Sequence, residues 1–136
     1  MRQASGRAAG LRGDAGAFTL SYVIIMPVFL AALMVIAQLA VYYLASSAAL
    51  AAARQGVDAA RAAHAPAGAG PGAAEAFARS TAPGYLLSPA AVLVPAGSPQ
   101  TIAIKVTGGV PSLVPGFPLL HVTQVAQAPL ERFTAP

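Results

Sequence analysis

The sequence contains no cysteine and no tryptophan, and only 9% of its 136 residues are charged. Without cysteine the chain has no disulfide, no thiol nucleophile and no thiolate ligand for a metal. Its charged content is far below the roughly 25% of an ordinary soluble domain. From Ala15 to Ala53 there is no Asp, Glu, Lys or Arg at all. This gap in charge indicates a membrane segment rather than the core of a soluble protein.

Residue types that carry out catalysis are also scarce. His64 and His121 are far apart in sequence, and neither has nearby ligands that would complete a zinc site. Asp58, Glu75 and Glu131 have no local spacing that would pair a general acid with a general base. The serines lack a GxSxG context, and the glycine-rich stretch GAGPGAA lacks the Lys-Ser/Thr of a phosphate-binding loop. We therefore predict that the protein is not an enzyme and that it binds no metal and no cofactor.

The basic residues give a formal net charge of +4. They are scattered along the chain and form no basic patch interleaved with aromatic side chains, which is the usual footprint of a nucleic-acid-binding surface. We therefore predict that the chain binds neither DNA nor RNA, and that its high isoelectric point reflects a shortage of acids.

What the sequence does contain is a long apolar run from Phe18 to Leu44, interrupted by Ser21, Pro27 and Gln38. A helix that crosses a bilayer needs about 20 apolar residues. Tyr22 and the pair Tyr42–Tyr43 are separated by about 20 residues, or roughly 30 Å of helix, and tyrosines favour the two membrane interfaces. We predict a transmembrane helix over residues 17–45, with a kink at Pro27 because proline lacks an amide hydrogen.

The charges that flank this run predict its orientation. Arg2, Arg7 and Arg12 precede it, and basic residues are retained in the cytoplasm. Residues 1–16 would therefore form a basic cytoplasmic leader of a single-pass protein of the cell membrane, with the C-terminal domain outside the cytoplasm. A secreted protein released by signal peptidase near Ala49-Leu50-Ala51 is an alternative, although the run exceeds the 7–15 residues or so of a signal core.

Beyond the apolar run, residues 46–64 are rich in alanine and predict an extracytoplasmic continuation of the helix, supported by an Arg54–Asp58 pair. Small residues recur at every fourth position and form a ridge that permits close approach to another helix: Ala48, Ala52, Gly56 and Ala60. An alanine-rich helix produces such ridges by composition alone, so both interpretations stay open.

The remainder predicts a Gly/Pro-rich linker over 65–84 with a short helix at Ala73–Ser80, followed by a small β domain over 85–136. A turn is expected at Gly108-Gly109. Alternating apolar residues predict three antiparallel strands, at Ala91–Pro95, Gln100–Thr107 and Leu119–Ala128. The expected fold class is α+β, with a long N-terminal transmembrane helix that extends outside the membrane and a small three-stranded sheet.

Two stretches carry a resemblance to a known family. GAFTLSYVIIMP, and ALAAARQG at Ala49–Gly56, resemble the TadE-like (TadE/TadG) family of pilin-like proteins of the Flp/tight-adherence pilus system. The resemblance implies that a prepilin peptidase cuts after Gly16 and leaves Ala17 as the new N-terminus, with Gly13 as the alternative cut site. It also implies that the partners are the membrane, other pilin-like subunits and the Tad/Flp assembly proteins.

One residue departs from the family pattern. Ser21 stands where pilins usually carry a glutamate, which is thought to pair with a neighbour's N-terminal ammonium group. A serine hydroxyl can instead bond to a carbonyl of its own helix. The expected function is therefore a minor subunit or accessory protein of a Flp/Tad-type IV pilus assembly or secretion apparatus. An unprocessed, membrane-anchored envelope binding protein is the other alternative.

Overall fold

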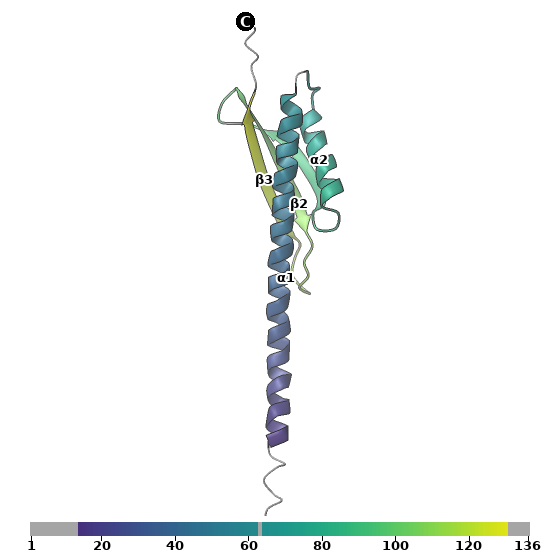
Figure 1. Ribbon diagram of the computed structural model, residues 1–136, viewed down its shortest axis with the longest axis vertical. Helices are drawn as coiled ribbons and strands as arrows, with labels where there is room; N and C mark the ends of the chain where they lie inside the picture. The colour runs from purple at the N-terminus through teal and green to yellow at the C-terminus, as the bar shows by residue number, and fades with distance from the viewer. Residues whose placement is uncertain (1–13, 63, 131–136) are drawn as a thin grey trace, which may run out of the picture. The chain divides into compact units, whose positions relative to one another are not determined.

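The structure is a computed structural model that describes residues 14–62 and 64–130, with side chains from Tyr22 onward. It contains two helices, α1 (Asp14–Arg61) and α2 (Ala69–Thr81), and three strands, β1 (Leu87–Val94), β2 (Thr101–Val110) and β3 (Leu120–Pro129) (Figure 1). The chain divides into two compact units, 1–36 and 37–136, which are described separately. We call the second unit the head. The start of the predicted leader and the end of the predicted β domain lie outside the described residues.

The first unit contains the N-terminal part of α1. The helix continues through Pro27, where the missing amide hydrogen leaves the carbonyl of Val23 without its helical partner. The described side chains from Tyr22 to Ile36 are all exposed, and none of them carries a charge. The described side chains of this unit therefore form no hydrophobic core, and the kink at Pro27 stays a prediction.

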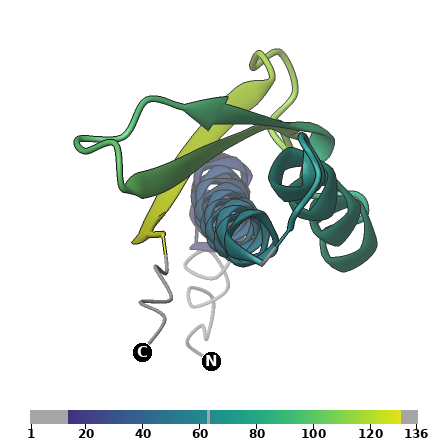
Figure 2. The same ribbon diagram turned by 90° about the horizontal axis from the view of Figure 1, so that it is seen from above.

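The head has two layers. Its sheet has the order β1-β2-β3 with antiparallel pairing throughout, and one face of the sheet packs on the later residues of α1 and on α2 (Figure 2). The largest fully buried side chains are Ile104, Val106, Val110 and Val122, all from β2 and β3. The helices contribute alanines and one valine to the same core. The expected α+β layout of a long apolar helix and a three-stranded antiparallel sheet is confirmed.

The predicted turn at Gly108-Gly109 is wrong, because both glycines lie inside β2. Gly109 pairs with His121, so the β2–β3 pairing continues past the predicted turn. A Cβ on Gly108 would collide with the side chain of Leu86, and a Cβ on Gly109 would lie 2.7 Å from Leu119 Cδ2. These glycines serve close packing on both faces of the strand, and the chain reverses in the loop 111–119.

Helix α2 begins earlier than predicted, at Ala69 instead of Ala73. Pro71 lies in the first turn, where a helix does not use the amide hydrogen, so the proline does not prevent helix formation. The buried residues Gly70, Ala74 and Ala78 lie on one face of α2. The predicted 65–84 linker therefore contains a 13-residue helix with one face in the core of the head.

Gly56 of α1 and Gly70 of α2 lie in close contact with each other. A Cβ on Gly56 would lie 2.8 Å from the carbonyl oxygen of Gly70 and 2.8 Å from Ala74 Cβ. A Cβ on Gly70 would lie 2.8 Å from Ala60 Cβ and 2.6 Å from Ile104 Cδ1. The two helices and β2 can therefore meet only where both helices carry glycine.

Glu75 connects α2 to the sheet. Its Oε1 accepts a hydrogen bond of 3.1 Å from the backbone N–H of Ala91 in β1, and its Oε2 accepts one of 2.8 Å from Arg79. β1 is an edge strand, and an unpaired amide on such an edge invites pairing with another chain. Glu75 thus protects part of this edge while it holds α2 in place.

The contact at Gly56 predicts opposite effects for the same substitution at two glycines. Gly56→Ala should lower the free energy of unfolding by about 1–2 kcal/mol, because overpacking against backbone exceeds the gain in helix propensity. Gly72→Ala should raise it by roughly 0.5–1 kcal/mol, because Gly72 lies in α2 with nothing near its Cβ position. Denaturant unfolding of the detergent-solubilised chain, followed by circular dichroism, measures both. Equal midpoints would contradict the close contact.

The role of Glu75 gives a second stability prediction. Glu75→Ala should cost about 2 kcal/mol, because it leaves the N–H of Ala91 without a partner inside the protein. Arg79→Ala is the matched control: it removes only an exposed i,i+4 ion pair, which contributes about 0.5 kcal/mol or less. If both variants unfold at the same denaturant concentration, the bond from Ala91 does not hold α2 on the sheet.

Candidate functional site: the apolar helix

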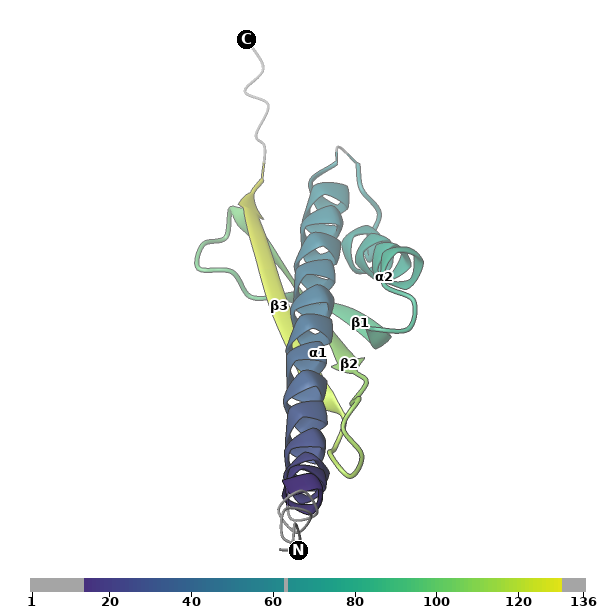
Figure 3. The ribbon, with the colours of Figure 1, turned by 60° about the horizontal axis from the view of Figure 1, so that its bottom comes forward.

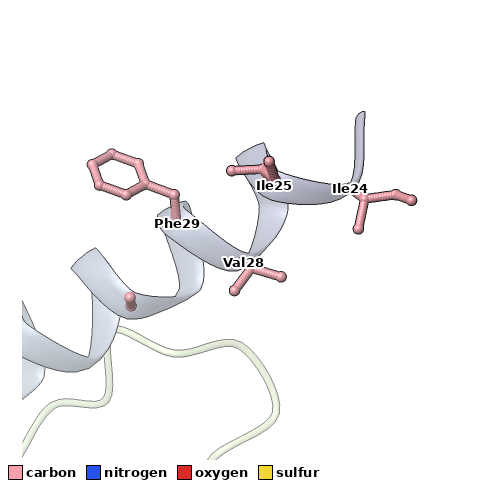
Figure 4. Close-up of a pocket in the computed structure, with 5 residues that line it drawn as sticks. Ile24, Ile25, Val28 and Phe29 are labelled. Atoms are coloured by element: carbon pink, nitrogen blue, oxygen red, sulfur yellow. The ribbon is translucent and has the colours of Figure 1, made fainter. Parts of the chain in front are cut away.

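The most distinctive surface is the apolar part of α1. Among the described residues it is the one helix that is long and apolar enough to cross a membrane, and none of its most apolar window is buried. Figure 4 shows Ile24, Ile25, Val28 and Phe29 projecting from successive turns of the helix. The central helix of a soluble domain would bury such side chains. Their exposure fits a lipid environment.

Within the head, α1 changes its surroundings over a few residues. Tyr43 is 73% exposed, whereas Ala45 and Ala49 are completely buried. The change coincides with a change in composition, because large apolar side chains are followed by alanines that allow the sheet to approach closely. The predicted end of the transmembrane segment at residue 45 therefore falls where α1 enters the core of the head.

Gln38 is the polar residue in the later part of the apolar run, and its amide is bound on both sides. Its Nε2 donates a hydrogen bond of 3.2 Å to the carbonyl oxygen of Pro111, and its Oε1 accepts one of 2.7 Å from the N–H of Leu113. The loop after β2 is thereby fixed to α1. The sequence showed Gln38 only as an interruption of the run, although a polar group in an apolar segment usually has a specific partner.

A second polar contact joins α1 to the sheet further along the helix, at Ser46. Gln124 of β3 donates a hydrogen bond of 2.7 Å from its Nε2 to the hydroxyl oxygen of Ser46. Both side chains are partly buried, so the bond is shielded from competing water. Together with Gln38, this contact sets the position of α1 on the β2–β3 half of the sheet.

The predicted ridge on α1 is occupied within the chain. Ala48 and Ala52 are buried in the core, and Gly56 meets α2 and β2 directly. Ala60 is partly buried and packs against the same cluster. The ridge is therefore buried in the core of its own chain, and another molecule would have to use a different surface.

The predicted processing site lies at the start of α1. Gly16, Ala17 and Ser21 fall within the helical range that begins at Asp14, and nothing is described of their side chains. Gly13 lies outside the described residues. A peptidase that cut after Gly16 would have to open the first turn of the helix, where helices fray most easily.

The acids whose side chains are described have structural partners. Asp58 forms an ion pair of 2.9 Å with Arg61 rather than with Arg54, and Glu75 contacts α2 and β1. His64 and His121 are both exposed. Across residues 14–62 and 64–130 there is no group of three or more His, Cys, Asp or Glu side chains that could hold a metal ion. Glu131 lies outside these ranges.

No protein-family model, curated protein or solved structure matches this chain.

The apolar surface of α1 predicts that the protein stays in the membrane fraction when membranes are extracted. A Leu30→Arg, Met34→Arg double variant should be released from membranes by alkaline carbonate, because each arginine at the helix centre costs about 2.5–3.5 kcal/mol. The matched control is Ala76→Arg, Ser80→Arg, which places the same two residues at the same spacing on an exposed face of α2. The control should remain in the membrane pellet. Release of wild type by carbonate would contradict membrane insertion.

Proposed function

We propose that this chain is a non-enzymatic, pilin-like component of a Flp/Tad-type pilus assembly or secretion apparatus. The observation that carries the proposal is the division of α1 between two environments: its early residues are apolar and exposed, and its later residues form the core of the head. One helix thus serves both as a membrane stem and as the spine of a small β domain. The two sequence stretches that resemble the TadE-like family lie on this same helix, GAFTLSYVIIMP and ALAAARQG.

The proposed arrangement places the N-terminus in the cytoplasm and the head outside it. The support is the basic leader before the apolar run, because arginines are retained on the cytoplasmic side. A prepilin peptidase would cut after Gly16, and glycine suits such a site because its backbone adopts extended conformations without a side-chain clash. The mature chain would then begin at Ala17.

Within such an apparatus, a minor or accessory role is favoured over that of the major filament subunit. Ser21 supplies no carboxylate to pair with the N-terminal ammonium group of a neighbour in the membrane. The small-residue ridge is already used inside the head, so contacts with neighbouring subunits would fall on the exposed apolar residues of α1. We propose that other pilin-like subunits and the Tad/Flp assembly proteins bind there.

The core of the head argues against release by signal peptidase. The Ala49-Leu50-Ala51 sequence lies inside α1, and Ala49 is completely buried. Cleavage there would remove Ala45, Ala48 and Ala49 from the core of the head and separate Ser46 from Gln124. A secreted product would therefore lose the helix face on which its sheet packs. The unprocessed envelope binding protein is the alternative that this argument leaves in place.

Processing gives a direct test of the proposal. When the chain is co-expressed with a prepilin peptidase, intact-mass spectrometry should find a mature N-terminus at Ala17. Gly16→Leu should leave the leader attached, because a branched side chain at the cut site cannot enter a protease cleft that accepts glycine. Gly13→Leu is the matched control and should still be cut after Gly16.

A co-expressed authentic prepilin shows that the peptidase is active. If that prepilin is cut while this chain keeps Met1, the chain is an unprocessed anchor and the pilin proposal fails. If Gly13→Leu blocks cleavage and Gly16→Leu does not, the cut site is Gly13 and the leader is shorter than proposed.

A further inference from the structure

The loop between β2 and β3, Pro111–Leu119, is unusually apolar for an exposed connection. We call it the β2–β3 loop. Phe117 is 68% exposed, and Leu113 and Leu119 are also largely exposed. No Asp, Glu, Lys or Arg occurs between Lys105 and Glu131. Loops that face water are normally polar, so these side chains need a different environment.

The position of the β2–β3 loop indicates what that environment is. The loop begins against Gln38, which binds Pro111 and Leu113 through both ends of its amide. Gln38 lies about 6 Å, or one helical turn, before Tyr42, on the apolar side of the membrane interface predicted at Tyr42 and Tyr43. Figure 3 shows this loop beside α1 at the end of the sheet. The loop therefore starts at a level of α1 that is predicted to contact lipid.

The backbone of the β2–β3 loop suits a place with little water. Its three prolines, Pro111, Pro115 and Pro118, have no N–H to satisfy. The N–H of Leu113 is bonded to Gln38, and the N–H of Phe117 donates a hydrogen bond of 3.2 Å to the carbonyl oxygen of Val114. Unsatisfied backbone groups are what normally keep irregular loops out of lipid. The headgroup region still contains water, which can bind the N–H groups that these two bonds leave over.

Gln38 gains from the same arrangement. A glutamine amide surrounded only by lipid would have no partner for its N–H donors or its carbonyl acceptor, which costs several kcal/mol. The backbone of the loop supplies one partner to each. The amide and the loop thus satisfy each other at the level where the apolar surface of α1 is exposed.

We propose that the β2–β3 loop inserts into the membrane interface on the side of the head, with Phe117 as the deepest side chain and Gln38 as its tether. The occupant of this apolar surface is the headgroup and upper acyl region of the bilayer that α1 spans. Continuity along the chain favours lipid: the loop is bonded to Gln38, the next residue Leu39 is 64% exposed, and neither the loop nor the apolar run of α1 contains a charged residue. The head would then be held at two points, which restricts its rotation on the membrane.

The inference rests on the membrane anchoring in the proposed function, and the absence of cysteine makes it easy to test. Three single-cysteine variants of the full chain, each labelled with an environment-sensitive nitrobenzoxadiazole dye, are placed in liposomes: Phe117→Cys, Leu30→Cys and Ser98→Cys. Ser98 is exposed in the connection between β1 and β2 and serves as the control in water. Quenching by lipids spin-labelled near the headgroup is compared with quenching by aqueous iodide.

We expect the label at Phe117 to be quenched several-fold more by shallow spin-labelled lipid than the label at Ser98, and to be protected from iodide. If the labels at Phe117 and Ser98 behave alike while the label at Leu30 is quenched by lipid, the inference is wrong and the anchor stands. If the label at Leu30 is also accessible to iodide, membrane anchoring itself fails, and the proposed function fails with it.

Dilution to one copy per nanodisc shows whether lipid or a second copy of the chain covers the surface of the loop. Quenching at Phe117 that persists after dilution supports lipid, whereas quenching that disappears assigns the surface to a second copy and overturns the inference. Gln38→Leu should reduce quenching at Phe117 by removing the tether. Ser47→Ala, which loses only a bond to Leu44 of the same helix, is its matched control and should leave quenching unchanged. An equal effect of both variants would refute the tether.

Discussion

The structure of the head depends on how closely α1 approaches its neighbours. At Gly56 and Gly70 the two helix backbones meet, and the end of the Ile104 side chain lies over both glycines. A methyl group at either position would collide with backbone or with a fixed side chain, so the contact exists only where both residues lack one. The alanines of α1 extend the same close packing along the sheet. A small domain with few large buried side chains obtains its stability from this close fit, because dispersion contacts fall off steeply with separation.

The close packing divides α1 into two parts with different chemistry. Small residues in the later part let the sheet and α2 pack on the helix, so the helix face that carries them is buried within the chain. The described large apolar residues in the earlier part, from Tyr22 onward, are exposed. Because these exposed side chains are apolar and uncharged, the earlier part is suited to lipid and to other apolar helices. This division is the basis of the proposed membrane component.

Much of this could be predicted from local patterns. The apolar run and the alanine-rich extension predicted one long helix, and the alternation in QTIAIKVT predicted a strand. The errors occurred where distant contacts override local preference. Gly108-Gly109 has the composition of a turn, yet Leu86 and Leu119 pack where its side chains would be, and the strand continues. The start of α2 contains Gly-Pro-Gly, but Gly70 is needed against α1. Glycine serves both in turns and at close packing contacts, and a local sequence pattern does not distinguish the two.

By itself, the sequence determined that a long uncharged helix precedes a small β region, because hydrophobicity and its period along the chain are local properties. It also determined which residues were available: no cysteine, two histidines and few acids. Only the tertiary structure decided how they are used. In the folded chain the small-residue ridge of α1 packs inside its own molecule. Glu75 accepts a hydrogen bond from the edge strand β1, and the loop after β2 is hydrogen-bonded to Gln38. The partners of Gln38 lie more than 70 positions away in the sequence. Such contacts form only when the sheet closes on the helix, and no local pattern encodes them.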